Sequence, residues 1–273
     1  MERPETVVIP AAGLGVRMRG ADLPPETPKE LLPLAGRPLI CHALDEALLA
    51  GMRRAVVVIR RGKEDLRRLV EDPAWARGRW PGAHENLERA RRRLEFSFPV
   101  QKRPRGEADA MLLAEAVAGG PLAVIYPDNV PHPPGALAEA CRVLAATGLD
   151  AVALMRVDPG LAGGIADAGR VDLKRAPDGS WRIRDFLPKG AGAFRPRFHG
   201  EMRTCGVFAA LPHWFAFIRR ADGPDLEGEL TDGKVRRVML EAGVEFAGAP
   251  VPGTVFDCGR PEGYAACRRV LEA

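Results

Sequence analysis

The segment from residue 7 to residue 38 constrains the fold more than any other part of this 273-residue chain. It begins with a short apolar run, Val7 to Ile9, which is typical of a buried strand. The run leads straight into a loop rich in small residues, among them Ala11, Ala12, Gly13 and Gly15. Small side chains leave backbone N–H groups accessible, so a polyanion can approach them closely. The pattern therefore favours a phosphate-binding loop at the end of a strand.

Two cations follow this loop. They are Arg17 and Lys29, and Lys29 stands just before a second apolar stretch at residues 31–34. A bare loop with two cations suits a triphosphate and the charge that develops in its transition state. The dinucleotide fingerprint is incomplete, because Met18 stands where its third Gly belongs. Many Gly-rich turns after strands serve only the turn, so the loop composition alone leaves phosphate binding open.

Apolar runs alternate with stretches of helical spacing as far as residue 155. We expect strands near residues 55–59, 94–100, 122–126 and 151–155, with helices between them, whereas Pro and Gly make residues 72–84 resemble a loop. Such alternation indicates an α/β fold with a doubly wound, mostly parallel sheet.

The pattern changes from Gly164 onward. Three expected strands, at residues 165–173, 181–186 and 203–210, follow without helices between them and indicate a smaller antiparallel β lobe lying over the sheet. A helix is expected at residues 261–271. We therefore expect a single domain over residues 1–273, with a first half at 1–160 and a second lobe with the C-terminal helix at 161–273.

Composition excludes several classes of protein. The apolar share is 46%, the mean hydropathy is −0.13, and no apolar run approaches the length of a membrane span. The N-terminus lacks an apolar signal region, and the five cysteines form no CxxC pair. These features predict a cytoplasmic protein without membrane contact, zinc site or disulfide framework.

The charge balance argues against nucleic-acid binding. The formal net charge of +4 is mild and suits an anionic small molecule. The densest basic run, residues 89–93, has no interleaved aromatic side chains for stacking on bases. We interpret it as the solvated face of a helix.

Several segments together resemble the sugar-1-phosphate nucleotidylyltransferases, most closely the bacterial UTP–glucose-1-phosphate uridylyltransferases. They occur in the family's order and span nearly the whole chain. They are Pro10–Met18 with Thr27–Leu34, Gln101 with Arg105–Ala110, Val124–Asn129, Gly228–Asp232, and Asp257–Gly259 with Gly263 and Tyr264. Residues 228–235 also approach a Walker A loop, but Val235 replaces the hydroxyl that would hold Mg²⁺.

The resemblance implies a Rossmann-like nucleotidyltransferase fold and a reaction without a protein nucleophile. A sugar-1-phosphate oxygen attacks the α-phosphorus of a nucleoside triphosphate, and an NDP-sugar and pyrophosphate form. The first half of the chain then binds the nucleotide and the second lobe binds the acceptor. The family often forms dimers or tetramers, so the resemblance leaves a homo-oligomer open.

The same resemblance assigns roles to the nucleotide side of the site. Arg17 and Lys29 are the catalytic cations, acting on the β/γ-phosphates and on the α- or incoming phosphate. Asp128 and Asp257 are hard oxygen ligands for Mg²⁺. The backbone of Ala11, Ala12, Gly13 and Gly15 binds the nucleotide, and Gln101 and Gly106 contact the base. Gln101 suits uracil or thymine, so UTP or dTTP is favoured, but a flipped amide would suit CTP.

Three of these side chains also have structural interpretations. Asp128 follows Pro127 and suits a turn, and Asp257 suits the start of a helix. Gln101 alone is also typical of a solvated strand end.

The acceptor side departs from the family. Lys189 matches the lysine that grips the sugar phosphate, and Gly164 and Glu201 are further candidates for acceptor binding. The family usually has Glu before this lysine, whereas this chain has Pro188, which offers no side-chain acceptor. Glu201, Asp185 or Glu229 are the candidates to replace it.

Two other functions stay open on the sequence. One is a cytidylyltransferase that acts on a non-sugar phosphorylated or phosphonate acceptor. The other is a non-catalytic, nucleotide-binding regulatory protein, which the presence of both cations and both metal ligands disfavours.

Overall fold

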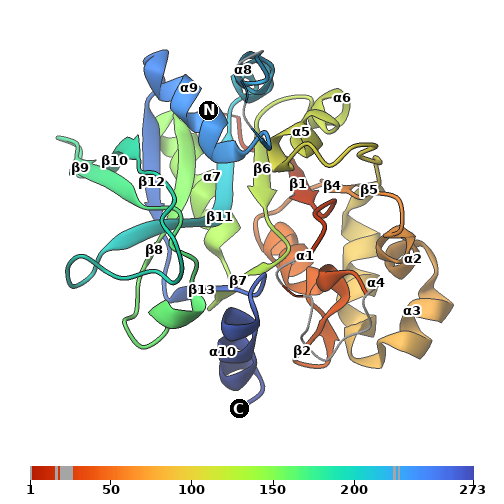
Figure 1. The fold of residues 1–273 in the computed structure, drawn as a ribbon. Helices are drawn as coiled ribbons and strands as arrows, with labels where there is room; N and C mark the ends of the chain where they lie inside the picture. The colour runs from red at the N-terminus through yellow and green to blue at the C-terminus, as the bar shows by residue number, and fades with distance from the viewer. Residues whose placement is uncertain (1, 16–17, 19–26, 224–225, 227) are drawn as a thin grey trace.

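A nine-stranded sheet forms the centre of the computed structural model, which describes residues 2–15, 18, 27–223, 226 and 228–273 (Figure 1). Arg17 therefore lies outside the described residues. In spatial order the strands are β5 (Glu95–Ser97), β4 (Arg54–Val58), β1 (Thr6–Pro10), β6 (Leu122–Ile125), β11 (Met202–Ala210), β8 (Asp150–Arg156), β12 (Phe246–Pro250), β10 (Trp181–Phe186) and β9 (Val171–Arg175).

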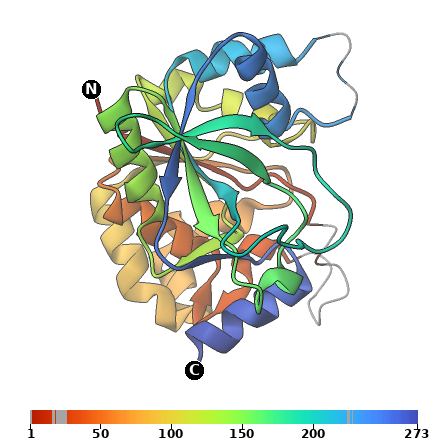
Figure 2. The same ribbon diagram turned by 90° about the vertical axis from the view of Figure 1, so that its left-hand side faces the viewer.

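Helices cover both faces of this sheet, as Figure 2 shows from the side. On one face lie α1 (Ile40–Leu49), α2 (Glu64–Glu71), α3 (Pro73–Arg79), α4 (His84–Arg93) and α7 (Ala136–Thr147). On the other lie α5 (Glu107–Leu112), α6 (Glu115–Ala118), α8 (His213–Ala221) and α9 (Asp232–Glu241). Strand β1 alternates between the two cores, since Val7 and Ile9 face the first and Val8 the second. The predicted α/β class with a doubly wound sheet is confirmed.

The sheet is mixed, but most of its strands share one direction. Pairing is parallel from β5 through β4 and β1 to β6, and again between β8 and β12. Among the described strands of this sheet, β11 and β10 run against the others. The expected antiparallel strands thus do not lie over the sheet. They join it, with β11 inserted between β6 and β8 and the β10–β9 hairpin at the edge.

Two local expectations were wrong. Residues 72–84 are not a loop: α3 begins at Pro73, and the carboxylate of Asp72 accepts a hydrogen bond from the Trp75 N–H at 2.9 Å. Asp at the cap and Pro at the first position start a helix that composition alone disfavours. The strand expected at 165–173 begins only at Val171, after the short 3₁₀ helix Ala162–Gly164.

Small antiparallel sheets and a last helix complete the fold near the C-terminus. β7 (Asn129–His132) pairs with β13 (Thr254–Asp257), and β2 (Pro33–Leu34) pairs with β3 (Arg37–Pro38). A third apolar cluster joins these segments to α10 (Pro261–Leu271). The β7–β13 pairing sets Asp257 opposite Asn129, and so brings a C-terminal carboxylate beside the end of β6. None of the described helices is long and apolar enough to cross a membrane.

Candidate active site

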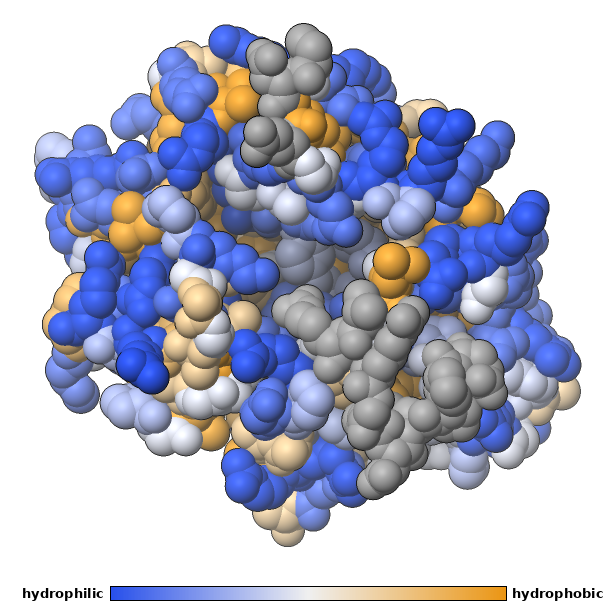
Figure 3. Space-filling view, viewed as in Figure 1, coloured by the Kyte–Doolittle hydropathy of each residue, from blue (hydrophilic) through white to orange (hydrophobic). Residues whose placement is uncertain are grey.

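A cavity of about 670 Å³ opens where β1 and β6 end. Figure 3 shows this face hollowed near its centre, with mostly hydrophilic side chains around the hollow. Its lining includes the loop after β1, the turn after β6, Lys29, Gln101 and Lys189. The carboxyl ends of adjacent parallel strands meet at one edge of a sheet, which explains why segments far apart in sequence converge here.

A buried ion pair fixes the loop after β1 relative to Lys29. The Lys63 ammonium donates to both carboxylate oxygens of Glu30 at 2.8 Å and to the Ala11 carbonyl at 2.6 Å. Glu30 is 0% exposed and Lys63 is 3% exposed. Burial lowers the pKa of Lys63, while the Glu30 carboxylate opposes that shift. The 3₁₀ turn Lys29–Leu31 is thereby tied to the loop, and Lys29 is held at the cavity.

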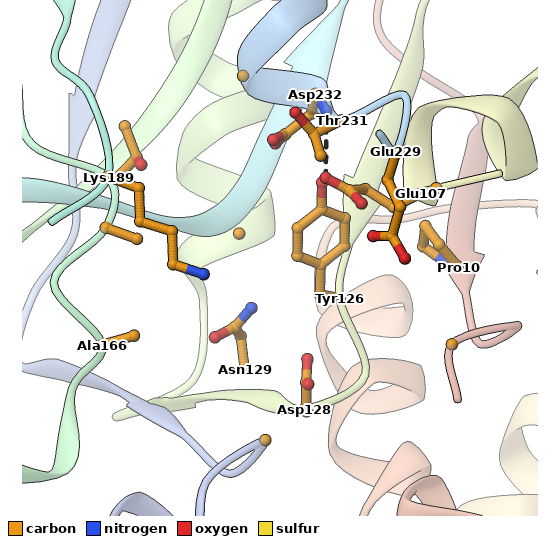
Figure 4. A pocket seen from close by; sticks show the side chains of 18 of the residues that line it. Pro10, Glu107, Tyr126, Asp128, Asn129, Ala166, Lys189, Glu229, Thr231 and Asp232 are labelled. Atoms are coloured by element: carbon orange, nitrogen blue, oxygen red, sulfur yellow. Dashed lines mark hydrogen bonds between the residues drawn. The ribbon is translucent and has the colours of Figure 1, made fainter. Parts of the chain in front are cut away.

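The expected catalytic cation and the first expected metal ligand are in direct contact. The Lys29 ammonium donates to Oδ2 of Asp128 at 2.5 Å, and both side chains are mostly buried. Asp128 lies in the turn after β6, between Tyr126 and Asn129 (Figure 4). The Asn129 N–H donates to the Tyr126 carbonyl at 2.9 Å, so the segment that carries Asp128 is a turn.

Gly259 keeps a space between the two expected metal ligands. A Cβ at this position would lie 2.5 Å from Asp128 Oδ2 and 3.2 Å from Asp257 Oδ1. The two carboxylates therefore border one small space that only glycine leaves open. Among the described residues no group of three His, Cys, Asp or Glu side chains forms a ready-made metal site. Two carboxylates suffice for Mg²⁺, because it keeps several waters and is commonly completed by phosphate oxygens.

Gln101 also lines the cavity, and two hydrogen bonds hold its side-chain amide in one orientation. Its Nε2 donates to the Gly106 carbonyl at 3.0 Å and to Oδ2 of Asp109 at 2.8 Å. Both partners can only accept, so the NH₂ group must face them. Oε1 is then the side-chain atom of Gln101 that can accept a hydrogen bond from a ligand. Gly106 has a φ of 118°, and a Cβ there would meet the Leu230 carbonyl at 2.3 Å.

Three acidic side chains and one tyrosine line the upper end of the cavity, and of these only Glu229 was a candidate on the sequence. Glu107, Glu229 and Asp232 lie around the ring of Tyr126 in Figure 4. The Asp232 N–H donates to Glu107 Oε1 at 3.2 Å. Burial, with the negative charge of Asp232, raises the pKa of Glu107 to about 7. The segment 228–232 had a family likeness, but nothing in the sequence paired it with Glu107.

Of the three residues expected to bind the acceptor, one lines the cavity and two do not. Lys189 lines the cavity and extends into it from the β10–β11 connection (Figure 4). Gly164 and Glu201 do not line it: Gly164 packs against Gly263, and Glu201 is 1% exposed. Glu201 instead accepts hydrogen bonds from Arg170 at 2.9 Å and Arg197 at 2.7 Å.

Of the other two candidates to replace the missing Glu, Glu229 lines the cavity and Asp185 does not. The structure adds two arginines that sequence reasoning missed, Arg170 and Arg203. Neither belongs to a motif, so only their placement reveals them.

Comparisons with known sequences find similar proteins over most of the chain. A family model for the MobA-like NTP transferase domain matches residues 7–243. A UTP–glucose-1-phosphate uridylyltransferase of Pseudomonas aeruginosa is 27% identical over 267 residues, covering 94% of this chain and 92% of the relative. One of Komagataeibacter xylinus is 30% identical over 265 residues, covering 92% and 88%.

Solved structures agree on the fold. A UDP-glucose pyrophosphorylase complexed with UDP-glucose superposes with a TM-score of 0.81 at 23% identity and covers 98% of both chains. A UTP-bound UGPase from Acinetobacter baumannii gives a TM-score of 0.77 at 19% identity, covering 99% of this chain and 94% of that one. At these identities the likeness establishes the shared fold.

Proposed function

Because the chain belongs to the MobA-like NTP transferase family, we propose that it transfers a nucleoside monophosphate from UTP or dTTP to a sugar-1-phosphate. The products are an NDP-sugar and pyrophosphate. The observation that carries the proposal is the contact of Lys29 with Asp128 in the cavity that the loop after β1 also lines. The names of the relatives point to UTP and a hexose-1-phosphate.

The chemistry needs positioning and charge neutralisation rather than a nucleophile from the protein. An oxygen of the acceptor phosphate forms the new bond to the α-phosphorus of the triphosphate, and the bond to the leaving pyrophosphate breaks. Lys29 is placed to hold the α-phosphate or the incoming phosphate, and Lys189 to hold the acceptor phosphate. The small residues at 11–15 let the triphosphate approach the backbone. Arg17 completes the cation set in this proposal.

Asp128 and Asp257 would hold a divalent cation, which we take to be Mg²⁺. When bound, it would neutralise phosphate charge and align the oxygens of the triphosphate. The space beside Gly259 and the hard oxygen donors on both sides fit such an ion. Lys29 lies in direct contact with Asp128 at the same place and contributes positive charge there.

Base selection follows from the orientation of Gln101. With Oε1 of Gln101 opposite N3 of the base, it accepts the N3–H of uracil or thymine, whereas N3 of cytosine is itself an acceptor and cytosine offers a donor only at its 4-amino group. Asp109 forbids the flipped amide, because a flip would set two acceptor oxygens against each other. This argues for UTP or dTTP over CTP and makes Asp109 a positioning residue for Gln101.

Replacing Asp109 by Asn should weaken this selection. An Asn side chain can turn either its NH₂ or its oxygen toward Gln101, so only the Gly106 carbonyl still opposes the flipped amide and that orientation becomes less unfavourable. We expect the ratio of kcat/KM for UTP to that for CTP to fall about tenfold, the scale of one hydrogen bond to a charged group. Asp172→Asn, an exposed change on β9, is the matched control. An unchanged ratio in Asp109→Asn would show that Asp109 only supports the fold.

The overall proposal is tested by measuring pyrophosphate release with each of UTP, dTTP, CTP, ATP and GTP against a panel of phosphorylated acceptors. The panel contains neutral hexose-1-phosphates, acidic sugar phosphates, phosphocholine and a phosphonate. We expect turnover with UTP or dTTP and a sugar-1-phosphate. If a purine triphosphate gave the highest kcat/KM, the base assignment would be wrong. If none of the sugar phosphates supported turnover, the acceptor class would be wrong.

A further inference from the structure

The wall of the cavity contributed by residues 166–206 contains no carboxylate side chain. Twelve residues of this range line the cavity, all within the described chain, and none is Asp or Glu. Three are cations: Arg170, Lys189 and Arg203. The carboxylates of the lining come from other segments, at positions 107, 128, 229, 232 and 257. Neutral sugar hydroxyls are commonly bound through carboxylate acceptors, and this wall offers them none.

Arg203 is the most unusual of the three cations. It lies on β11 and is 7% exposed. Its Nε donates to the Ala168 carbonyl at 2.9 Å, and Nη1 lies 4.0 Å from the Met155 sulfur. No carboxylate oxygen of the described residues lies within ion-pair distance of its guanidinium, and Asp257 and Asp167 act on it only from farther away. Burial lowers the pKa of Arg203, as expected for a desolvated cation.

Arg170 lies in the same wall, but carboxylates neutralise its charge. Its guanidinium donates to Asp167 at 2.9 Å and to Glu201 at 2.9 Å, so two carboxylates neutralise it. Both arginines lie over the ring of Phe194, at 4.0 Å for Arg170 and 5.7 Å for Arg203. The ring and the Ala168 carbonyl orient Arg203 without neutralising it. A buried guanidinium without a close counterion is costly, and an anionic ligand in the cavity would supply the missing charge.

We propose that the acceptor carries a second anionic group beyond the phosphate that is transferred, and that Arg203 binds it. The group is an oxyanion, either a carboxylate or a second phosphate, because the planar guanidinium fork matches both. Lys189, exposed at the end of the same wall, stays available for the phosphate that reacts. This inference rests on the proposed nucleotidyl transfer and narrows its acceptor to acidic sugar-1-phosphates or compounds of that charge pattern.

Pro188 is consistent with this narrowing. It stands directly before Lys189 and lines the cavity without a polar side-chain atom that could accept a hydrogen bond from a sugar hydroxyl. Pro188 supplies no side-chain hydrogen-bond acceptor to this wall, and Arg203 supplies a buried cation to it. Both favour an acidic acceptor over a neutral one.

The test compares acceptors that differ only in the second charge. With UTP and Mg²⁺, pyrophosphate release is measured for glucose-1-phosphate, glucuronic acid 1-phosphate and glucose-1,6-bisphosphate. We expect kcat/KM to be at least about tenfold higher for one of the two acidic acceptors, the scale of one charge-assisted contact. A preference for the uronic acid identifies a carboxylate, and a preference for the bisphosphate identifies a phosphate.

Two variants assign the preference to Arg203. Arg203→Met should remove the advantage of the acidic acceptor while leaving kcat/KM for glucose-1-phosphate within about threefold, and Arg203→Lys should restore part of it. Arg184→Met, an exposed change on β10 outside the cavity, removes the same charge and should change neither value. Thermal melts check that each variant is folded. If Arg203→Met is unfolded, the acceptor ratio of the wild-type protein and of Arg203→Lys decides.

The possible outcomes separate the two proposals. Equal or better turnover of glucose-1-phosphate in the wild-type protein would overturn this inference and leave nucleotidyl transfer standing. A loss of kcat/KM for all three acceptors alike in folded Arg203→Met would show that Arg203 serves the reacting phosphate, and would also overturn it. No turnover of UTP with any acceptor would instead count against the proposed function.

Discussion

Lys29→Ala is expected to lower kcat about a hundredfold or more while changing the KM for the nucleotide much less, the scale of losing one preorganised electrostatic contact. Lys29 is held in place before any substrate binds, since its neighbour Glu30 is locked by Lys63 in a buried ion pair. A cation fixed in this way stabilises charge that develops on the transferring phosphoryl group without reorganising at the moment of reaction. Steady-state kinetics with varied UTP and saturating acceptor measures both parameters.

The control for Lys29→Ala is Lys174→Ala, an exposed change on β9 that removes the same charge outside the cavity lining. It should leave kcat and KM unchanged. A Lys29 variant in which KM rises and kcat does not would show that Lys29 contributes equally to ground-state and transition-state binding. Circular dichroism of both variants checks that the loss of the Asp128 contact has not altered the fold.

The nucleotide side of the site was predictable because adjacent parallel strands end at one edge. β1 and β6 pair in parallel, so the loop at residues 11–15 and the turn at Asp128 had to converge once both strands were identified. Gln101 follows the same logic, because its backbone N–H bonds to the Ile59 carbonyl just beyond β4. Strand periodicity and loop composition are local signals, and here local signals determine the geometry.

The parts that could not be predicted depend on pairings between distant segments. Lys63 meets Glu30 and Ala11 only after the pairing of β1 with β4 brings the segments that follow these strands together, and no spacing in the sequence predicts that contact. The Asp109 carboxylate fixes the amide of Gln101 across a turn, which requires knowledge of side-chain direction.

The acceptor side was the least predictable because β11 enters the main sheet instead of forming a separate layer. Its insertion between β6 and β8 carries Arg203 to the cavity wall. Glu201, which directly precedes β11, does not line the cavity and accepts a hydrogen bond from Arg170 instead. A residue type in a plausible position was therefore insufficient to identify an acceptor ligand.

Removing either proposed metal ligand is expected to abolish turnover through loss of the bound cation. Asp128→Asn and Asp257→Asn keep the size of the side chain and lose its charge, so the space beside Gly259 stays open while the hard anionic donor disappears. We expect the affinity for Mn²⁺, a spectroscopic substitute for Mg²⁺, to fall about a hundredfold or more, because even outer-shell partners of metal ligands are worth ten- to a hundredfold. Electron paramagnetic resonance titration in the presence of UTP measures this affinity without relying on turnover.

The two Asn variants should also differ from each other. Asp128 contacts Lys29 directly, so Asp128→Asn removes the counterion of that lysine as well as a metal ligand. Asp257 lies on β13, and Asp257→Asn leaves both partners of the Lys29–Asp128 ion pair in place, so it should weaken metal binding and keep that pairing intact. Asp172→Asn on β9 is the control for charge alone and should bind Mn²⁺ as the wild-type protein does. Full activity of both site variants in excess chelator would remove the metal from the mechanism and leave Lys29 and Arg17 to neutralise the triphosphate.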